Sequence, residues 1–371
     1  MGKTGVANLP LHSGKAPKWL FDRMVKLSRG IVDVILLEYG KDEFLKRISD
    51  PFWFQSLSCV LGFDCHSSGC TTVTCGAPKE AIHPGEHGFA IAGGKGKASR
   101  KTIQQIEEIG ETFGFTDSKI KELQYSSRMS AKVDSTAVQD SHILYHHVFL
   151  FTEQGNWSVI QQGMRSDINY ARRYHWLSGF DSFIVDPHNS IMGEKVDTVL
   201  DMTSKNSVSS QKACVDLVCG HPRYLANDWA SLIRLEDQTT LDEYNGSTTY
   251  SKHIVCLDMP RSINWNKMRE IYEFQPKNYE ELLSLRGVGP TTVRALALIS
   301  DLIYDEKPSW KDPVKYSFAV GGKDGVPYPV DRKAMDESTA LIQSGIERAK
   351  VGDTEKMHAI KRLKAFVSTD S

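Results

Sequence analysis

The residues that most constrain the fold lie at 147–163, where the chain reads HVFLF-TEQGN-WSVIQQG. Two apolar, aromatic and β-branched runs flank a short segment with a Gly-Asn turn, which is typical of a β-hairpin. A strand pair needs other elements to cover it, and the neighbouring sequence supplies helices. Apolar residues recur three and four positions apart over 11–50 and again over about 102–123, which predicts helices in both segments.

The other segments of the first two thirds are less regular. Phe89–Ala92 has the pattern of a short strand that enters a Gly-Lys loop, and INYARRYHWLSGF at 168–180 predicts a helix. Residues 133–146 have helical spacing without clear boundaries. The polar stretch 181–250 is rich in serine and threonine and predicts loops and short helices.

The last third of the chain has a helical pattern from about residue 262 onward, interrupted by a proline- and glycine-rich stretch at 305–330. We therefore predict an α+β protein. A mixed α/β domain with a β-hairpin is expected at 1–258, followed by an all-α domain at 259–371.

The composition excludes some classes of protein. The formal net charge is −1, so no overall basic field attracts nucleic acid, and any such site must be local. No run of 18 apolar residues is present, and residues 1–27 lack the apolar segment of a secretory signal. These features predict a cytoplasmic protein without membrane association, whose seven cysteines are reduced.

A glycine-rich turn joins two apolar helical patterns near residue 287. The stretch LRGVGPTTVRALAL resembles the helix-hairpin-helix motif. In that motif the glycines let the backbone approach a phosphate, which then faces free N–H groups and the positive end of the second helix. The resemblance implies that this segment binds the DNA backbone, and it leaves binding to RNA open. The alternative is that the segment is only a turn between two packed helices. The residues expected to bind are Arg286, Gly287, Val288, Gly289, Thr291, Thr292 and Arg294.

A second resemblance follows at 328–342, YPVDRKAMDESTALI. It is similar to the segment after the hairpin in the helix-hairpin-helix-GPD DNA glycosylases, where an aspartate is the catalytic carboxylate. Asp331 takes that place and would stabilise a developing oxocarbenium ion or orient a water, unless it only caps a helix. Asp331 follows Gly289 by 42 positions, more than is usual in that family. Thr291 stands where bifunctional members have a lysine, which disfavours a lyase step.

Most of the chain resembles one further family. The stretches that carry this resemblance are LPLHSGKAPKWLFDRMVKL, DPFWFQSLSCVLGFDCHSSGCTT, AGGKGKASRKT, AKVDSTAVQD, LYHHVFLF, WSVIQQGM and ARRYHW. They are similar to an archaeal and bacterial family known only as a domain of unknown function. Its members carry a helix-hairpin-helix near the end of the same chain. The resemblance implies a DNA-linked role and names no activity.

Two basic stretches in the first 258 residues are candidates for nucleic-acid binding. GGKGKASRK is a basic glycine loop suited to phosphate, or a solvated turn. ARRYHW interleaves cations with aromatic rings, which favours backbone contact and base stacking. The cations concerned are Lys95, Lys97, Arg100, Lys101, Arg172 and Arg173.

Acidic residues and histidines gather around the start of the hairpin. Asp134 and Asp140 precede it, and His146 and His147 open it. Such groups predict a metal-dependent nuclease that would hold Mg²⁺, or a buried polar network. Three functions stay open: a DNA-binding protein of repair or processing with glycosylase-like chemistry, a nuclease, and a non-catalytic nucleic-acid-binding protein. The sequence indicates no particular protein partner.

Overall fold

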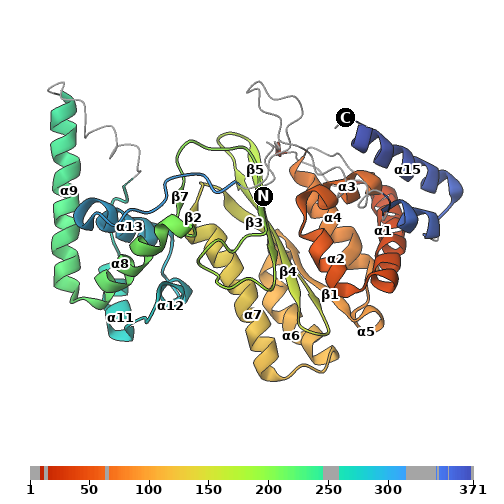
Figure 1. Ribbon diagram of the computed structural model, residues 1–371, viewed down its shortest axis with the longest axis horizontal. Coiled ribbons are helices and arrows are strands. Elements are labelled where there is room, and N and C mark those ends of the chain that lie inside the picture. The colour runs from red at the N-terminus through yellow and green to blue at the C-terminus, as the bar shows by residue number, and fades with distance from the viewer. Residues whose placement is uncertain are drawn as a thin grey trace.

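The protein has the predicted α+β fold, and its main sheet is antiparallel with five strands (Figure 1). The computed structural model describes residues 9–11, 16–62, 67–244, 259–314, 340, 342–349 and 351–368. Everything said below about the structure concerns these residues.

The central sheet has five strands in the order β1-β3-β4-β5-β6, and all its neighbouring strands are antiparallel. The strands are β1 (Phe89–Lys95), β3 (Ile143–Thr152), β4 (Trp157–Arg165), β5 (Tyr170–Leu177) and β6 (Ser190–Met192). Strands β3 and β4 confirm the predicted hairpin, with Phe151 paired to Trp157 beside the turn. A second, two-stranded sheet pairs β2 (Val138–Gln139) with β7 (Leu200–Asp201).

The prediction of a helix at 168–180 is wrong, because this segment contains β5. Its side chains alternate between the two faces of the sheet, and each face meets a buried layer. Trp176 packs in the hydrophobic cluster on one face, whereas Arg173 on the other face lies over the ring of Phe54. The order of aromatic and basic residues in this segment is compatible with a helix. It is equally compatible with a strand that is buried on both faces.

One face of the sheet is covered by the amino-terminal helices. Phe89, Val148, Leu150 and Ile160 pack there in one cluster with apolar residues of these helices. The helices are α1 (Lys18–Glu38), α2 (Lys41–Ile48), α3 (Pro51–Leu61), α4 (Ser68–Ala81) and α5 (Pro84–His87). The helices predicted within 11–50 are confirmed as α1 and α2, which are separated at Gly40, where φ is +85°.

The opposite face is covered by α6 (Thr102–Thr112) and α7 (Asp117–Lys132), as the helical pattern at 102–123 predicted. Short helical turns precede α6 and follow α7: η1 (Gly96–Lys101) and the π-helical η2 (Val133–Ala137). Phe149 and Phe151 of the sheet belong to the cluster on this face. The same cluster continues away from the sheet into a group of further helices.

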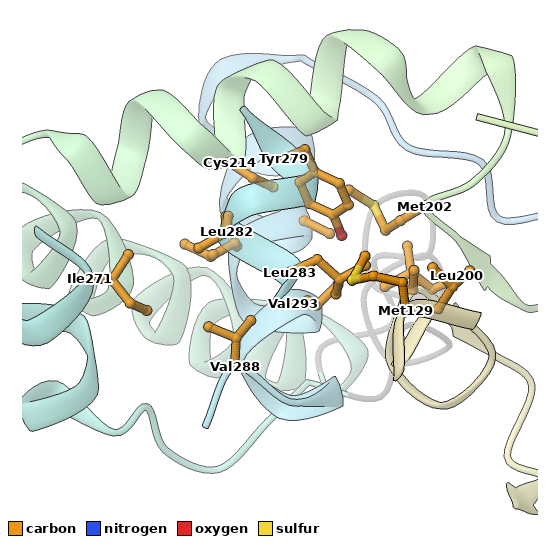
Figure 2. Close-up of a cluster of buried hydrophobic side chains, with 14 of the residues drawn as sticks. Met129, Leu200, Met202, Cys214, Ile271, Tyr279, Leu282, Leu283, Val288 and Val293 are labelled. Carbon is orange, nitrogen blue, oxygen red and sulfur yellow. The ribbon is translucent and has the colours of Figure 1, made fainter. Parts of the chain in front are cut away.

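The further helices lie at one end of the molecule (Figure 1). They are α8 (Val208–Cys219), α9 (Pro222–Tyr244), α11 (Trp265–Phe274), α12 (Tyr279–Ser284) and α13 (Pro290–Tyr304), and the turn η3 (Lys205–Ser207) leads into α8. Figure 2 shows the buried side chains that join them to Met129 and Leu200 near the sheet. Helix α13 packs against α8 and α9, so one helical cluster includes residues from both sides of the predicted boundary at 258–259.

The carboxy-terminal helix α15 (Asp353–Ser368) lies at the opposite end of the molecule from α13 (Figure 1). It packs on α3, and Leu363 joins the cluster of the amino-terminal helices. The described helices after residue 259 are therefore divided between the two hydrophobic clusters, with α13 in one and α15 in the other.

Two further sequence predictions have structural outcomes. No helix within the described residues is both long and apolar enough to cross a membrane. Cys75, Cys214 and Cys219 are free thiols, whereas Cys59 is disulfide-bonded, so the prediction of reduced cysteines is wrong at that position.

The crossing of α1 with the carboxy-terminal segment gives a test of the fold. A Cβ added to Gly30 would lie 2.3 Å from Cβ of Ala349, closer than two carbon atoms can pack. A Cβ on Gly76 would meet Phe21 at an ordinary 3.7 Å. Both glycines are helical, so alanine brings about 1 kcal/mol of helix propensity at either position.

We therefore expect Gly76→Ala to be neutral or stabilising. Gly30→Ala should instead lower the free energy of unfolding by about 1–3 kcal/mol, because the helices must move apart. Urea unfolding measures both values, and limited proteolysis should release the carboxy-terminal segment of Gly30→Ala first. Equal stability of the two variants would contradict the close crossing.

Candidate nucleic-acid interface and adjoining pocket

The segment that resembles a helix-hairpin-helix forms two helices joined by a tight turn. Helix α12 begins after Asn278, whose side chain accepts a hydrogen bond from the Glu281 N–H at 2.9 Å. In the turn, Gly287 has φ +88°, a left-handed conformation that favours glycine. Val288 is fully buried and anchors the turn in the hydrophobic cluster.

The amino terminus of α13 is open to the outside. Its cap residue, Gly289, has no side chain with which to bond the first N–H groups of the helix, and Pro290 occupies the first helical position. The N–H groups of Thr291 and Thr292 have no partner within the helix at this end. Arg286, Gly287 and Thr291 are exposed, whereas Thr292 is buried.

The conformation of Gly289 is unusual for a position occupied by glycine. Its φ of −121° and ψ of −176° suit any residue. A Cβ placed there would meet no atom within 4 Å. Neither the backbone nor the packing of the described residues therefore requires glycine here.

The carbonyl groups of the turn are held by a lysine from α7. The Lys132 ammonium donates to the Leu285 carbonyl at 3.4 Å and also to the Val288 carbonyl. Burial, followed by the nearby Lys267, lowers the pKa of Lys132. A Cβ on Gly287 would lie 3.1 Å from Cε of Lys267, so two lysine side chains flank the turn.

A groove of about 760 Å³ begins at this helix end. Pro290, Thr291 and Arg294 line one side of it, and Arg261 lines it as well. The other side is formed by residues that lead from α7 into β3, ending at Leu144. Arg294 is held in place by donating its Nε–H to Gln139 Oε1 at 2.8 Å.

A smaller pocket of about 220 Å³ adjoins the groove, and Leu144 lines both. It lies between α6, α7, β3 and β4, and its lining includes Ser127, His147 and Gln161. Ser127 Oγ lies 2.8 Å from His147 Nε2, and His147 Nδ1 lies 2.9 Å from Gln161 Oε1. The amide of Gln161 in turn donates to Asp134 Oδ2.

Asp134 is buried at the end of this chain of hydrogen bonds. Trp176 Nε1 donates to Oδ2 of Asp134 at 3.0 Å, and His188 Nε2 bonds to Oδ1. Burial raises the pKa of Asp134, and the contacts with His188 and Trp176 oppose that rise. Both carboxylate oxygens are therefore engaged inside the protein.

Asp140 is engaged in the same way by a different set of groups. Arg172 Nη1 donates to its Oδ2 at 2.9 Å, Tyr174 donates its hydroxyl at 2.6 Å, and the N–H of His142 donates to Oδ1. Arg172 also forms two hydrogen bonds with Asp312, at 2.7 and 3.1 Å. Burial raises the pKa of Asp140, but Arg172 and His142 outweigh it and hold that pKa below its usual range.

The prediction that Arg172 and Arg173 form a basic surface patch is wrong, because both side chains are fully buried. Arg172 serves the ion pairs with Asp140 and Asp312. On the other face of the sheet, Arg173 donates to His175 at 2.9 Å and packs over Phe54 at 4.3 Å. Neither guanidinium is exposed for contact with a nucleic acid.

The basic glycine loop is exposed beside the small pocket. Lys95, Lys97, Arg100 and Lys101 are all exposed, and Ser99 of the same loop lines the pocket. The loop follows Gly93, whose φ is +91°. A Cβ there would lie 2.2 Å from the His147 carbonyl oxygen, so glycine lets β1 approach the strand that carries His147.

The predicted nuclease residues are brought together only in part. His147 and Asp134 belong to one hydrogen-bond chain, Asp140 is bonded to Arg172, and His146 is a separate buried side chain that also lines the small pocket. Within the described part of the chain, no three histidine, cysteine, aspartate or glutamate residues are arranged to hold a metal ion. The Mg²⁺ site of the nuclease hypothesis is thus not found there. Asp331 lies outside the described residues.

Sequence reasoning missed Ser127, Arg128, Lys132 and Arg261. Arg128 lines the small pocket and Lys132 contacts the hairpin, one helical turn further along α7. That spacing of four marks a shared helix face and was a usable signal. Ser127 is one of many serines, and nothing local distinguishes it.

The buried state of His147 predicts sensitivity to acid. Burial lowers its pKa to about 4, and the hydrogen bond that His147 donates to Gln161 opposes this shift. In the unfolded chain this histidine has a pKa of about 6.5, so it is protonated between pH 6.5 and 4. In the folded chain it stays neutral over this range. The stability from this group is fully present above pH 6.5 and is lost as the pH falls toward 4.

At pH 5 this one group should lower the free energy of unfolding by about 2 kcal/mol relative to pH 7.5. Urea unfolding measures the decrease in the free energy of unfolding from pH 7.5 to pH 5. This decrease should be about 2 kcal/mol smaller in His147→Asn than in the wild type. His221→Asn, at an exposed position, is the matched control. An equal loss in the wild type and in His147→Asn would refute the buried neutral state of His147.

Comparison with known proteins identifies the family of this chain. No curated protein and no solved structure matches the chain. A family model described as "Protein of unknown function (DUF763)" matches residues 5–330, which include the sheet, both pockets and the hairpin. The chain therefore belongs to the DUF763 family of proteins of unknown function.

Proposed function

We propose that this protein binds DNA through the backbone of its helix-hairpin-helix turn and acts in DNA repair or processing. The observation that carries the proposal is Gly289, a glycine that the protein's own backbone and packing do not require. The space where its side chain would stand lies at the positive end of α13. A phosphate oxygen in that space would accept hydrogen bonds from the first N–H groups of the helix.

The charges around the turn support the same proposal. Lys132 donates to the carbonyl groups of Leu285 and Val288, so a cation from α7 lies against the acceptors of the turn. Arg286 is exposed at the turn, and Arg261 is exposed in the groove beside it. These local cations give a chain of net charge −1 a site where phosphates are attracted.

Contacts of this kind grip the backbone and do not read the sequence of bases. We therefore propose binding that depends on salt and varies little with sequence. DNA is the proposed ligand. RNA is the alternative ligand, and it is compared with DNA in the binding assay described below. A cytoplasmic location belongs to the proposal, since the protein would meet its ligand there.

The role of Gly289 is tested by adding a side chain to it. Gly289→Val should fold normally, because its φ suits valine and nothing lies within 4 Å of the new Cβ. The valine should nevertheless fill the space that a phosphate needs, so affinity for a labelled duplex should fall at least about tenfold, on the order of 1.4 kcal/mol. Fluorescence anisotropy at about 100 mM salt and a thermal melt measure affinity and folding.

Gly85→Val is the matched control, because Gly85 is exposed in α5 and a Cβ added to it would also meet no atom within 4 Å. It should bind DNA like the wild type. Wild-type affinity in Gly289→Val would show that no phosphate approaches α13, and the proposal would fail.

The contribution of Arg286 is tested by the salt dependence of binding. Each phosphate contact contributes about 0.9 to the slope of log K against log salt on duplex DNA. Arg286→Gln should therefore reduce the slope by about 1 on every duplex sequence. Lys361→Gln, an exposed site on α15 at the other end of the molecule, should leave the slope unchanged. Equal slopes for Arg286→Gln and the wild type would remove this residue from the interface.

A further inference from the structure

We propose that Ser127 is a nucleophile, activated by His147 as general base, that attacks phosphate esters in the small pocket beside the hairpin. Ser127, His147 and Gln161 all line this pocket of about 220 Å³. Nothing in the DNA-binding proposal requires these three residues. The assignment of a nucleic-acid substrate does rest on that proposal, whereas the nucleophile itself does not.

The hydrogen-bond chain fixes the direction of each bond. Trp176 Nε1 is only a donor, so Asp134 Oδ2 acts as an acceptor, and the group of Gln161 that faces it must be the amide NH₂. Gln161 therefore turns its oxygen toward His147 Nδ1, which must carry the proton. His147 Nε2 is left with a lone pair, and it lies 2.8 Å from Ser127 Oγ. This is the arrangement in which an imidazole takes a proton from a serine hydroxyl.

The group that bonds directly to the base, His147, is the amide of Gln161. The carboxylate of Asp134 bonds to that amide and does not touch His147. In hydrolytic triads a carboxylate bonds directly to Nδ1 of the histidine and stabilises the imidazolium ion. Here Gln161 fixes the orientation of His147, and Asp134 fixes the orientation of Gln161. Burial lowers the pKa of His147 to about 4, so the ring is neutral at pH 7 and able to accept a proton. A bound phosphate would raise that pKa.

The surroundings of the pocket favour an anionic substrate. None of the described residues that line it is acidic, and Arg128 lies next to Ser127 among them. The exposed cations of the glycine loop stand beside it: Lys95, Lys97, Arg100 and Lys101. Leu144 is shared with the groove that begins at the hairpin, so a strand held there would reach the pocket. A phosphodiester of a nucleic acid is the ester that fits this charge and this position.

The reaction balances without an oxidant or a reductant. Ser127 Oγ forms a bond to phosphorus while its proton passes to His147 Nε2. The bond from phosphorus to the leaving oxygen breaks, and that oxygen takes the proton from His147. Water then attacks the phosphoserine and gives a proton to His147. The bond between Ser127 and phosphorus breaks, and the serine oxygen recovers that proton, so one water is consumed per ester.

The first test uses a fluorophosphonate, a small phosphorus electrophile, on the full-length protein without nucleic acid. The bond between phosphorus and fluorine should break as the bond to Ser127 Oγ forms, and intact mass with peptide mapping should place one adduct on Ser127. Ser127→Ala should give no adduct, and His147→Asn should react at least about tenfold more slowly. Ser126→Ala is the control, because the Ser126 hydroxyl bonds to the Glu122 carbonyl of its own helix.

A folded wild type without an adduct on Ser127 would overturn the proposal. So would an unchanged rate in His147→Asn. Thermal melts establish that each variant is folded, and if Ser127→Ala unfolds, the adduct mapped in the wild type decides. Because labelling needs no DNA, this result is independent of whether the hairpin binds DNA.

The second test addresses the substrate. End-labelled single-stranded DNA is incubated with the protein and quenched with acid. A covalent adduct of protein and DNA that is present in the wild type and absent in Ser127→Ala would support a nucleic-acid ester. Labelling of Ser127 by the fluorophosphonate with no DNA adduct and no cleavage would overturn that choice of substrate, even if the hairpin binds DNA.

Discussion

The buried guanidinium of Arg172 is the interaction on which the arrangement of the sites depends. It joins Asp140, which leads into β3, to Asp312, which follows α13, while Arg172 itself belongs to β5. Three distant parts of the chain thus meet at one charge. Loss of Arg172 would leave two carboxylates buried without their cation, which typically costs about 3–5 kcal/mol. The ion pairs of Arg172 therefore fix the position of α13, the second helix of the helix-hairpin-helix, relative to the sheet.

Helix α7 connects the two candidate sites. Ser127 and Arg128 line the small pocket, and Lys132 binds the carbonyl groups of the hairpin turn at the end of the same helix. His147 of β3 and Gln161 of β4 line the pocket from the sheet. Leu144 lines both the groove at the helix-hairpin-helix turn and the small pocket, so the two candidate sites adjoin.

The local elements were largely predictable, and the long-range contacts were not. The β-hairpin, the helices around residues 18–48 and 102–132 and the glycine turn all follow from short-range patterns. Strand β5 was missed because it is buried on both faces, and Arg172, which its sequence context predicts at the surface, compensates buried carboxylates. The meeting of Ser127 with His147 depends on how α7 packs on the sheet, and no spacing in the sequence encodes it.

The central claim is that a nucleic-acid backbone meets the uncapped N–H groups at the start of α13. Hydrogen–deuterium exchange, measured by mass spectrometry with and without a saturating DNA duplex, tests this directly. The account predicts slower exchange in peptides that span 285–292, since bound phosphates would accept hydrogen bonds from the Thr291 and Thr292 amides, and unchanged exchange in α15. Slower exchange elsewhere, with none over 285–292, would contradict it.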